Sequence, residues 1–148
     1  MNTNLPTVLI VEDDLDLADI YKSHLAKEAL ELMHVDSARL ALEMIEKVLP
    51  DLVLLDLQLP DGDGMDVLRH IHKNEIPSAV VIMTGNGSME GAVLAMRYGA
   101  KDFLEKPFNG DRLRATVLNG LELHHLSGLV SKYRKYKSHI FILQAVKY

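Results

Sequence analysis

Short, uninterrupted apolar runs alternate along this chain with longer segments in which apolar residues recur every three or four positions. The runs cover residues 7–11, 32–35, 52–55, 79–83 and 102–104. Runs of this length, rich in branched residues and bounded by turn residues, are typical of strands buried on both faces of a parallel sheet. The run at 32–35 is the weakest of the five. The pattern predicts five strands.

The intervening segments predict five amphipathic helices. Helical spacing of apolar residues covers 15–29, the stretch between the cap residue Ser37 and Pro50, 65–73, 88–98 and 111–123, with the last helix able to continue to 136. Gly99 follows the fourth helix in the position that a left-handed cap requires. Strict alternation of strands and helices predicts an α/β fold: a five-stranded parallel sheet with helices on both faces, doubly wound and flavodoxin-like, plus a C-terminal linker helix.

Polar residues stand where these predicted strands end. Glu12 and Asp13 follow the first strand, Asp56 ends the third, Thr84 ends the fourth, and Lys106 follows the fifth. Because all carboxyl ends of a parallel sheet lie at one edge, where such sheets bind their ligands, we expect these side chains to be neighbours. Taken singly, Glu12 or Asp13 is equally an N-cap, Thr84 a turn residue and Lys106 a surface lysine. The coincidence of all of them at strand ends is the specific signal.

Three crowded carboxylates favour a hard cation. Mg²⁺ takes one or two carboxylates together with water and phosphate oxygens, and would offset the repulsion among Glu12, Asp13 and Asp56. With the Lys106 ammonium and the Thr84 hydroxyl nearby, the set suits phosphoryl transfer onto a carboxylate, with Asp56 as the nucleophile. The residues therefore predict a magnesium-dependent phosphoacceptor.

Length and charge narrow the class of protein. A chain of 148 residues is large enough for one well-packed domain. Residues 1–122 hold eleven Lys and Arg against twenty-one Asp and Glu, a charge of −10, whereas the last 26 residues hold five basic residues and no acid. The acidic body disfavours direct nucleic-acid binding. No cysteine, no signal-peptide pattern and no apolar run of membrane-spanning length occurs, so we expect a cytoplasmic protein without a membrane partner.

Four motifs resemble the receiver domain of two-component response regulators. They are Ile-Val-Glu-Asp-Asp at 10–14, Pro-Asp-Leu-Val-Leu-Leu-Asp-Leu-Gln-Leu-Pro at 50–60, Met-Thr-Gly at 83–85, and Gly-Ala-Lys-Asp-Phe-Leu-Glu-Lys-Pro at 99–107. The resemblance implies that Asp56 is the phosphoacceptor, Asp13 a direct Mg²⁺ ligand and Glu12 an acid one step removed from the ion, with the backbone carbonyl of Gln58 completing the protein ligands. The family commonly has Asp at the position of Glu12.

The resemblance also implies a conformational switch. Thr84 would move toward the phosphoryl group and Phe103 would rotate inward, although Phe103 is equally a core residue by its pattern. Relatives often carry Tyr at that position, and Phe103 lacks its hydroxyl. The Lys106-Pro107 bond is expected to be cis. Gln58 and Asn86 occupy positions that tune dephosphorylation in the family.

The segment 96–107 is similar to receivers of NtrC-type transcriptional regulators of the LuxO group. We therefore expect a receiver at 5–123 and a helical tail at 124–148, as the N-terminal signalling module of a transcriptional regulator. The partner of the receiver would be a sensor histidine kinase or a histidine phosphotransfer protein. The receiver itself would catalyse nothing beyond its own phosphorylation and dephosphorylation. Apolar residues at helical spacing within 122–136 suggest a homodimer through that helix.

Other functions fit the sequence less well. The glycines at 85, 87 and 91 follow the wrong strand and have the wrong final spacing for a dinucleotide fingerprint. A flavin-binding relative of the fold would need a phosphate-cradling loop where Glu12 and Asp13 stand. An aspartyl-phosphate hydrolase would carry Asp at position 58, which is Gln58. A stand-alone receiver and a docking module that is never phosphorylated remain alternatives.

Overall fold

A five-stranded parallel sheet forms the centre of the computed structural model, which describes residues 5–85 and 89–146. The strands lie in the order β2-β1-β3-β6-β7, and all neighbours pair in parallel. Their bounds are β1 Thr7–Val11, β2 Glu31–Val35, β3 Leu52–Asp56, β6 Ala79–Thr84 and β7 Asp102–Glu105. The predicted five strands and their parallel arrangement are confirmed, with β7 one residue longer and β2 beginning one residue earlier.

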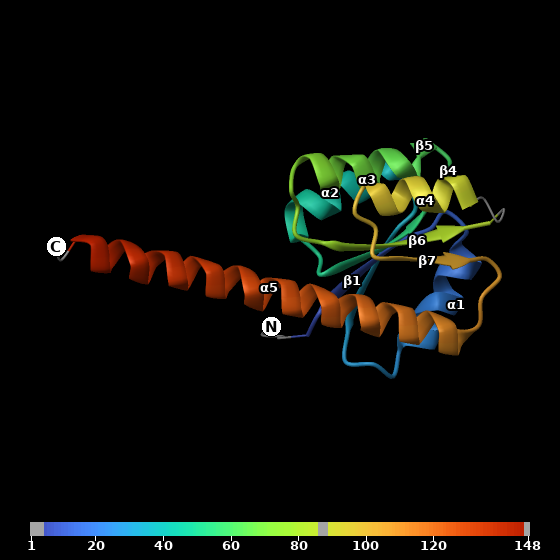
Figure 1. Cartoon of the computed structure of the whole chain (residues 1–148). Helices are drawn as coiled ribbons and strands as arrows, with labels where there is room; N and C mark the ends of the chain where they lie inside the picture. The colour runs from blue at the N-terminus through green and yellow to red at the C-terminus, as the bar shows by residue number, and fades with distance from the viewer. Residues whose placement is uncertain (1–4, 86–88, 147–148) are drawn as a thin grey trace.

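Helices cover both faces of the sheet (Figure 1). The helices are α1 Leu15–Leu25, α2 Ala38–Val48, α3 Gly64–Lys73, α4 Met89–Arg97 and α5 Gly110–Val146. Strand residues alternate between the faces: Leu9 and Val53 join the core beneath α2, α3 and α4, while Val8 and Leu52 join the core beneath α1 and α5. This alternation follows from the two-residue repeat of a strand and requires apolar residues on both sides.

The first helix is shorter than the sequence pattern suggests. We expected it to reach residue 29, but α1 ends at Leu25, and the Glu28 amide donates to the Leu25 carbonyl in the turn that follows. The reason lies in the sheet, because β2 pairs with β1 from Glu31 onward and the Glu31 amide donates to the carbonyl of Pro6. The chain must turn after Leu25 to enter that register.

A small hairpin that the sequence pattern did not predict follows β3. Strand β4, Gln58–Leu59, pairs antiparallel with β5, Gly62–Asp63. Pro60 and Gly62, together with Gly64 after the hairpin, suggested only a loop. The hairpin leads directly into α3 and places Gln58 beside the end of β3.

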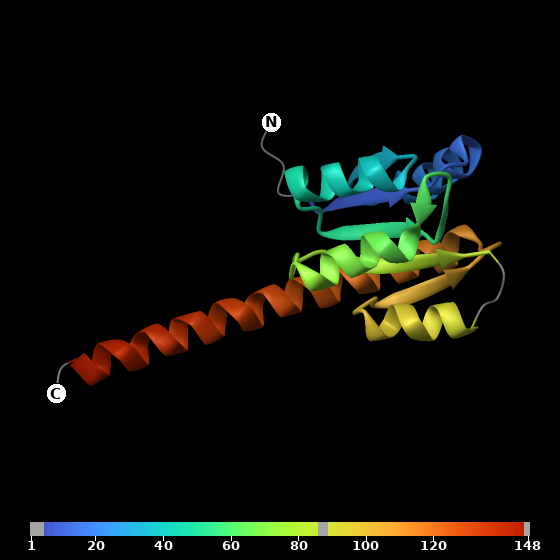
Figure 2. The same ribbon diagram turned by 90° about the horizontal axis from the view of Figure 1, so that it is seen from above.

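Helix α5 continues well past the sheet and projects from the body (Figures 1 and 2). We expected a helix from 111 that could reach 136, and α5 begins at Gly110 and extends to Val146. Its first turns pack through Leu113, Val117 and Leu121 against the sheet. In the described part of the chain, no helix is both long enough and apolar enough to cross a bilayer.

Candidate phosphoacceptor and cation site

Strands β1 and β3 deliver the acidic residues to one edge of the sheet. The two strands pair up to Val11 opposite Leu55, so Glu12 and Asp56 follow at the same level. Glu12 is 1% exposed and Asp56 is 5% exposed. Buried carboxylates are uncommon unless they are paired or bind a cation.

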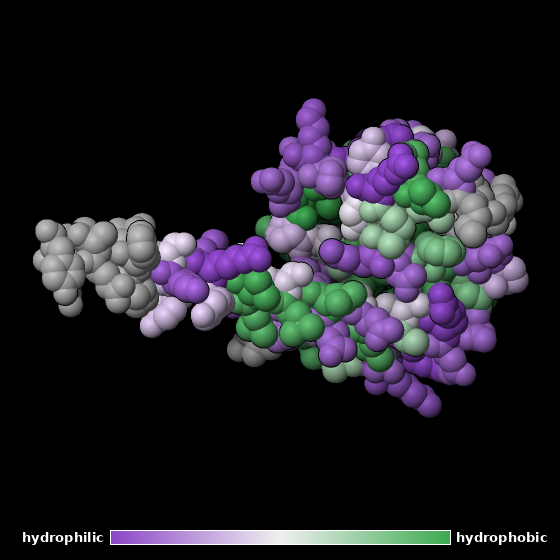
Figure 3. Space-filling view, viewed as in Figure 1, coloured by the Kyte–Doolittle hydropathy of each residue, from purple (hydrophilic) through white to green (hydrophobic). Residues whose placement is uncertain are grey.

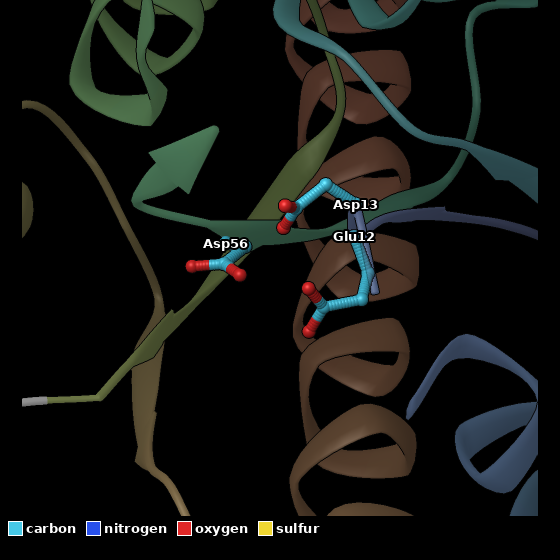
Figure 4. Close-up of side chains that lie close together, drawn as sticks. All are labelled: Glu12, Asp13 and Asp56. Atoms are coloured by element: carbon cyan, nitrogen blue, oxygen red, sulfur yellow. The ribbon is translucent and has the colours of Figure 1, made fainter. Parts of the chain in front are cut away.

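Glu12, Asp13 and Asp56 form a compact cluster, and their side chains point toward a shared space (Figure 4). One carboxylate oxygen from each residue lies within 4.8 Å of the others. Asp13 is exposed to solvent, whereas the other two are buried. The cluster therefore opens to solvent on the side of Asp13.

Lys106 supplies the positive charge at the cluster. Its Nζ donates to Glu12 Oε1 at 2.5 Å and to Asp56 Oδ2 at 2.9 Å. The Lys106 amide also donates to the Thr84 carbonyl, which ties the end of β7 to the end of β6. The following bond, Lys106-Pro107, is cis, in agreement with the expectation from the sequence.

Burial sets the protonation balance in this cluster. Removal from water raises the pKa of Glu12 to about 7, against the hydrogen bond from Lys106, which lowers it. Burial alone would lower the pKa of the Lys106 ammonium, but the hydrogen bonds to Glu12 and then Asp56 outweigh it and hold that pKa above its ordinary value. One ammonium thus faces two buried acids, and the cluster retains capacity for more positive charge.

Two neighbours of Glu12 were not among the residues singled out from the sequence. The Tyr21 hydroxyl donates to Glu12 Oε1 at 3.5 Å, and His34 Nε2 donates to the Glu12 carbonyl at 2.7 Å. The Tyr21 ring stacks on Phe108 at 5.1 Å between centroids, and burial raises the pKa of Tyr21 to about 12. No local pattern links residues so far apart in the chain, so only the tertiary fold shows that they hold Glu12.

The cap of α1 is Asp14, and neither Glu12 nor Asp13 has that role. Asp14 Oδ1 accepts from the amides of Asp16 and Leu17. The alternative that Glu12 or Asp13 is merely an N-cap is therefore wrong, and their carboxylates are left for the cluster.

Two further predicted site residues, Gln58 and Thr84, lie close to Asp56 at the same edge of the sheet. The Gln58 amide donates to Asp56 Oδ1 at 2.9 Å, and Thr84 is buried at the end of β6. Phe103 is half-buried on β7 and packs against the core beneath α2, α3 and α4. Asn86 lies outside the described residues.

The residues present fit a hard divalent cation. Carboxylate and backbone carbonyl oxygens are the ligands that Mg²⁺ and Ca²⁺ prefer, and sites for Mg²⁺ keep an open side for water. The cluster provides three carboxylates of which one is exposed, together with an excess of acid over Lys106. The donor set and its opening to solvent are those of an oxygen-ligated cation site.

Comparison with known proteins matches residues 8–118 to the response regulator receiver domain. Among curated proteins, the chain is 44% identical over 112 residues to the luminescence regulatory protein LuxO of Vibrio campbellii, covering 76% of this chain and 25% of LuxO. It is 38% identical over 119 residues to the C4-dicarboxylate transport transcriptional regulatory protein DctD of Pseudomonas aeruginosa, covering 80% and 26%. The chain thus spans about a quarter of the length of these relatives.

Solved structures give the same result. The signal receiver domain of a LuxO repressor protein from Vibrio parahaemolyticus superposes with a TM-score of 0.83 at 45% identity, covering 85% of this chain and 97% of that domain. NtrX from Brucella abortus superposes with a TM-score of 0.81 at 36% identity, covering 90% of this chain and 30% of NtrX. The family model matches most of this chain, and the chain superposes on nearly the whole of a solved receiver domain. This chain therefore belongs to the response regulator receiver domain family, among the receivers of NtrC-type regulators.

Proposed function

We propose that Asp56 accepts a phosphoryl group from the phosphohistidine of a sensor histidine kinase or a histidine phosphotransfer protein. An Asp56 carboxylate oxygen attacks phosphorus, a P–O bond forms, the P–N bond breaks, and the histidine nitrogen keeps the electron pair and takes a proton. The observation that carries the proposal is the placement of Asp56, buried at a strand end beside the Lys106 ammonium and two further acids.

A magnesium ion would be held by Asp13, Asp56 and the Gln58 carbonyl, with Glu12 one step behind them. When bound, it offsets negative charge on the phosphoryl oxygens. The side chains around it have their own tasks. Lys106 places a fixed positive charge beside Asp56 Oδ2, and the Gln58 amide holds Oδ1, so the carboxylate is oriented before any phosphoryl group arrives.

The proposed switch uses Thr84 and Phe103. Thr84 stands at the end of β6 and would turn its hydroxyl toward the phosphoryl oxygens, and Phe103 on the neighbouring strand would rotate into the space released. The two lie on adjacent strands, since β6 pairs with β7 and Ile82 is opposite Phe103. Phe103 has no hydroxyl, so its position would be set by packing alone. Gln58 and Asn86 would set the rate at which the phosphoryl group is hydrolysed.

The receiver, with proposed bounds 5–123, would act as the N-terminal signalling module of a cytoplasmic transcriptional regulator. This part of the proposal is supported by the relatives LuxO and DctD, whose names describe regulators and of which the chain matches about a quarter. The domain would catalyse only its own phosphorylation and dephosphorylation and would not itself contact nucleic acid. The segment 124–148 would be the helical tail that links it to an output.

The projecting part of α5 would pair with a second copy of the chain through residues 122–136. Leu123, Leu126, Val130 and Tyr133 are each close to half-exposed or more, at spacings of three, four and three residues. Figure 3 shows apolar surface where the helix leaves the body. Such spacing is that of a two-stranded coiled coil. Truncation after Leu123 should lower the sedimentation coefficient to that of a monomer, and an unchanged oligomeric state would exclude this contact.

Labelling by a small phosphodonor tests the central proposal. The wild-type chain with Mg²⁺ should acquire one label that hydroxylamine removes, as expected of an acyl phosphate, and Asp56→Asn should acquire none. Asp19→Asn, the same chemical change at an exposed position on α1, is the matched control and should label normally. Undiminished labelling of Asp56→Asn would place the acceptor elsewhere. Absence of labelling in the wild type would favour a docking module.

A further inference from the structure

The hairpin that follows Asp56 carries a backbone group of the proposed cation site. Gln58 on β4 pairs with Asp63 on β5, and Leu59 pairs with Gly62, so Pro60 and Asp61 form a two-residue loop at the tip. The Gln58 amide donates to Asp56, and its carbonyl is the proposed ligand. Two paired residues on each side are too few to fix a hairpin by themselves.

Asp61 connects the tip of this hairpin to the start of α2. Its Oδ1 accepts from the amide of Ala38 at 2.8 Å, and its Oδ2 accepts from the amide of Arg39 at 3.0 Å. The amides of Arg39 and Ala38 hold the pKa of Asp61 below its ordinary value. Both oxygens are therefore engaged with backbone groups more than twenty residues away in the chain.

Helix α2 already has a cap of its own. Ser37 Oγ accepts from the amide of Leu40 at 3.2 Å, which satisfies one of the free donors of the first turn. The helix is also held by Ala41 and Ile45, both fully buried in the core. Because α2 is held in place without Asp61, the hydrogen bonds from α2 to Asp61 mainly restrain the hairpin.

We propose that Asp61 is a positioning residue for the cation site: by fastening the tip of the β4–β5 hairpin to α2, it holds the Gln58 carbonyl at the edge of the acidic cluster. This inference rests on the proposed function, because it takes the Gln58 carbonyl as a ligand. Gln58, Pro60 and Asp61 are exposed, while Leu59 packs partly buried against the core, so the two Asp61 hydrogen bonds are the contacts that fasten the tip itself. Groups that orient metal ligands typically change metal affinity tenfold or more when removed.

The test compares Asp61→Ala, Asp61→Asn and Ser37→Ala with the wild type, using calorimetric titration with Mg²⁺ on the otherwise complete chain. Asp61→Ala should bind about tenfold more weakly. Asp61→Asn keeps one acceptor oxygen and should lie between Asp61→Ala and the wild type. Ser37→Ala removes a cap from the same helix but leaves the hairpin fastened, so it should bind like the wild type. Faster amide exchange at Gln58 in Asp61→Ala, but not in Ser37→Ala, provides a readout independent of the ion.

Repeating the titrations at high ionic strength distinguishes the loss of the Asp61 negative charge from a displacement of the Gln58 carbonyl. A general effect of the lost negative charge is screened by salt, whereas a displaced ligand is not. Loss of affinity that persists in salt supports the inference. Equal affinity in Asp61→Ala and wild type, equal losses in Asp61→Ala and Ser37→Ala, or a loss that disappears in salt would each overturn it. If the wild type itself does not bind Mg²⁺, the proposed cation site fails first, and that result is distinct from all of these.

Discussion

Replacing Glu12 by Gln should stabilise the protein when no divalent cation is present. Burial raises the pKa of Glu12 to about 7 in the folded protein, compared with 4.5 for an ordinary glutamate. Between these two values the folded protein retains a proton that the unfolded chain has released. The contribution of Glu12 to stability is therefore fully present below pH 4.5 and is lost as the pH rises to about 7.

The size of the effect follows from the same two values. At about 1.4 kcal/mol for each factor of ten in proton affinity, ionising Glu12 above pH 7 reduces the free energy of unfolding by about 3 kcal/mol. Gln has no proton to lose, and its side-chain oxygen can still accept from Lys106. Glu12→Gln should therefore gain up to about 3 kcal/mol over the wild type at pH 8 and lose most of the pH dependence between 4.5 and 7.

Urea unfolding in the presence of a chelator, over a pH series, measures this difference through the transition midpoint. Glu105→Gln is the matched control, because Glu105 is exposed at the end of β7, the edge strand of the same sheet, and such surface changes usually stay within about 0.5 kcal/mol. A Glu12→Gln protein less stable than the wild type at pH 8 would mean that the ion pair with Lys106 outweighs the cost of burying the charge, and the electrostatic account of the cluster would be wrong.

The remaining predictions concern backbone fit, capping and the ammonium. A Cβ on Gly64 would lie 2.3 Å from the Asp56 carbonyl oxygen, so Gly64→Ala should cost about 1–3 kcal/mol in urea unfolding and slow phosphodonor labelling. Gly62→Ala, where a Cβ meets nothing within 4 Å, should do neither. Asp14→Ala removes the cap of α1 and should lower the free energy of unfolding by about 1 kcal/mol. A labelling rate equal to that of the wild type would show that this cap is not part of the site. Lys106→Met should slow labelling at least about a hundredfold, as loss of a charge-stabilising donor does, and a wild-type rate would exclude Lys106 from the chemistry.

Much of the fold could be predicted from the sequence because the signals are local and repeated. A strand buried on both faces needs a continuous apolar run, and β3 has one from Leu52 to Leu55, fully buried, before it ends at the buried acid Asp56. The convergence of Asp56 and Lys106 was also predictable, since a parallel sheet brings all its carboxyl ends to one edge whatever the separation along the chain. What the pattern could not give was the end of α1, which is set by the register of β2 on β1.

The acidic residues near the site show where such prediction stops. Asp14, Asp61 and Asp63 look alike in the sequence, each next to a turn and a helix start. Asp14 and Asp63 cap the helices that follow them, which local spacing can suggest. Asp61 instead accepts two amides from α2, a helix that precedes it in the chain. A carboxylate accepts from whichever free backbone donors the fold places near it, and those of α2 lie near Asp61 because of how β1, β2 and β3 are paired in the sheet. The role of Asp61 is therefore a property of the assembled sheet, which is why the proposed link between hairpin and cation site has to be tested on the folded chain.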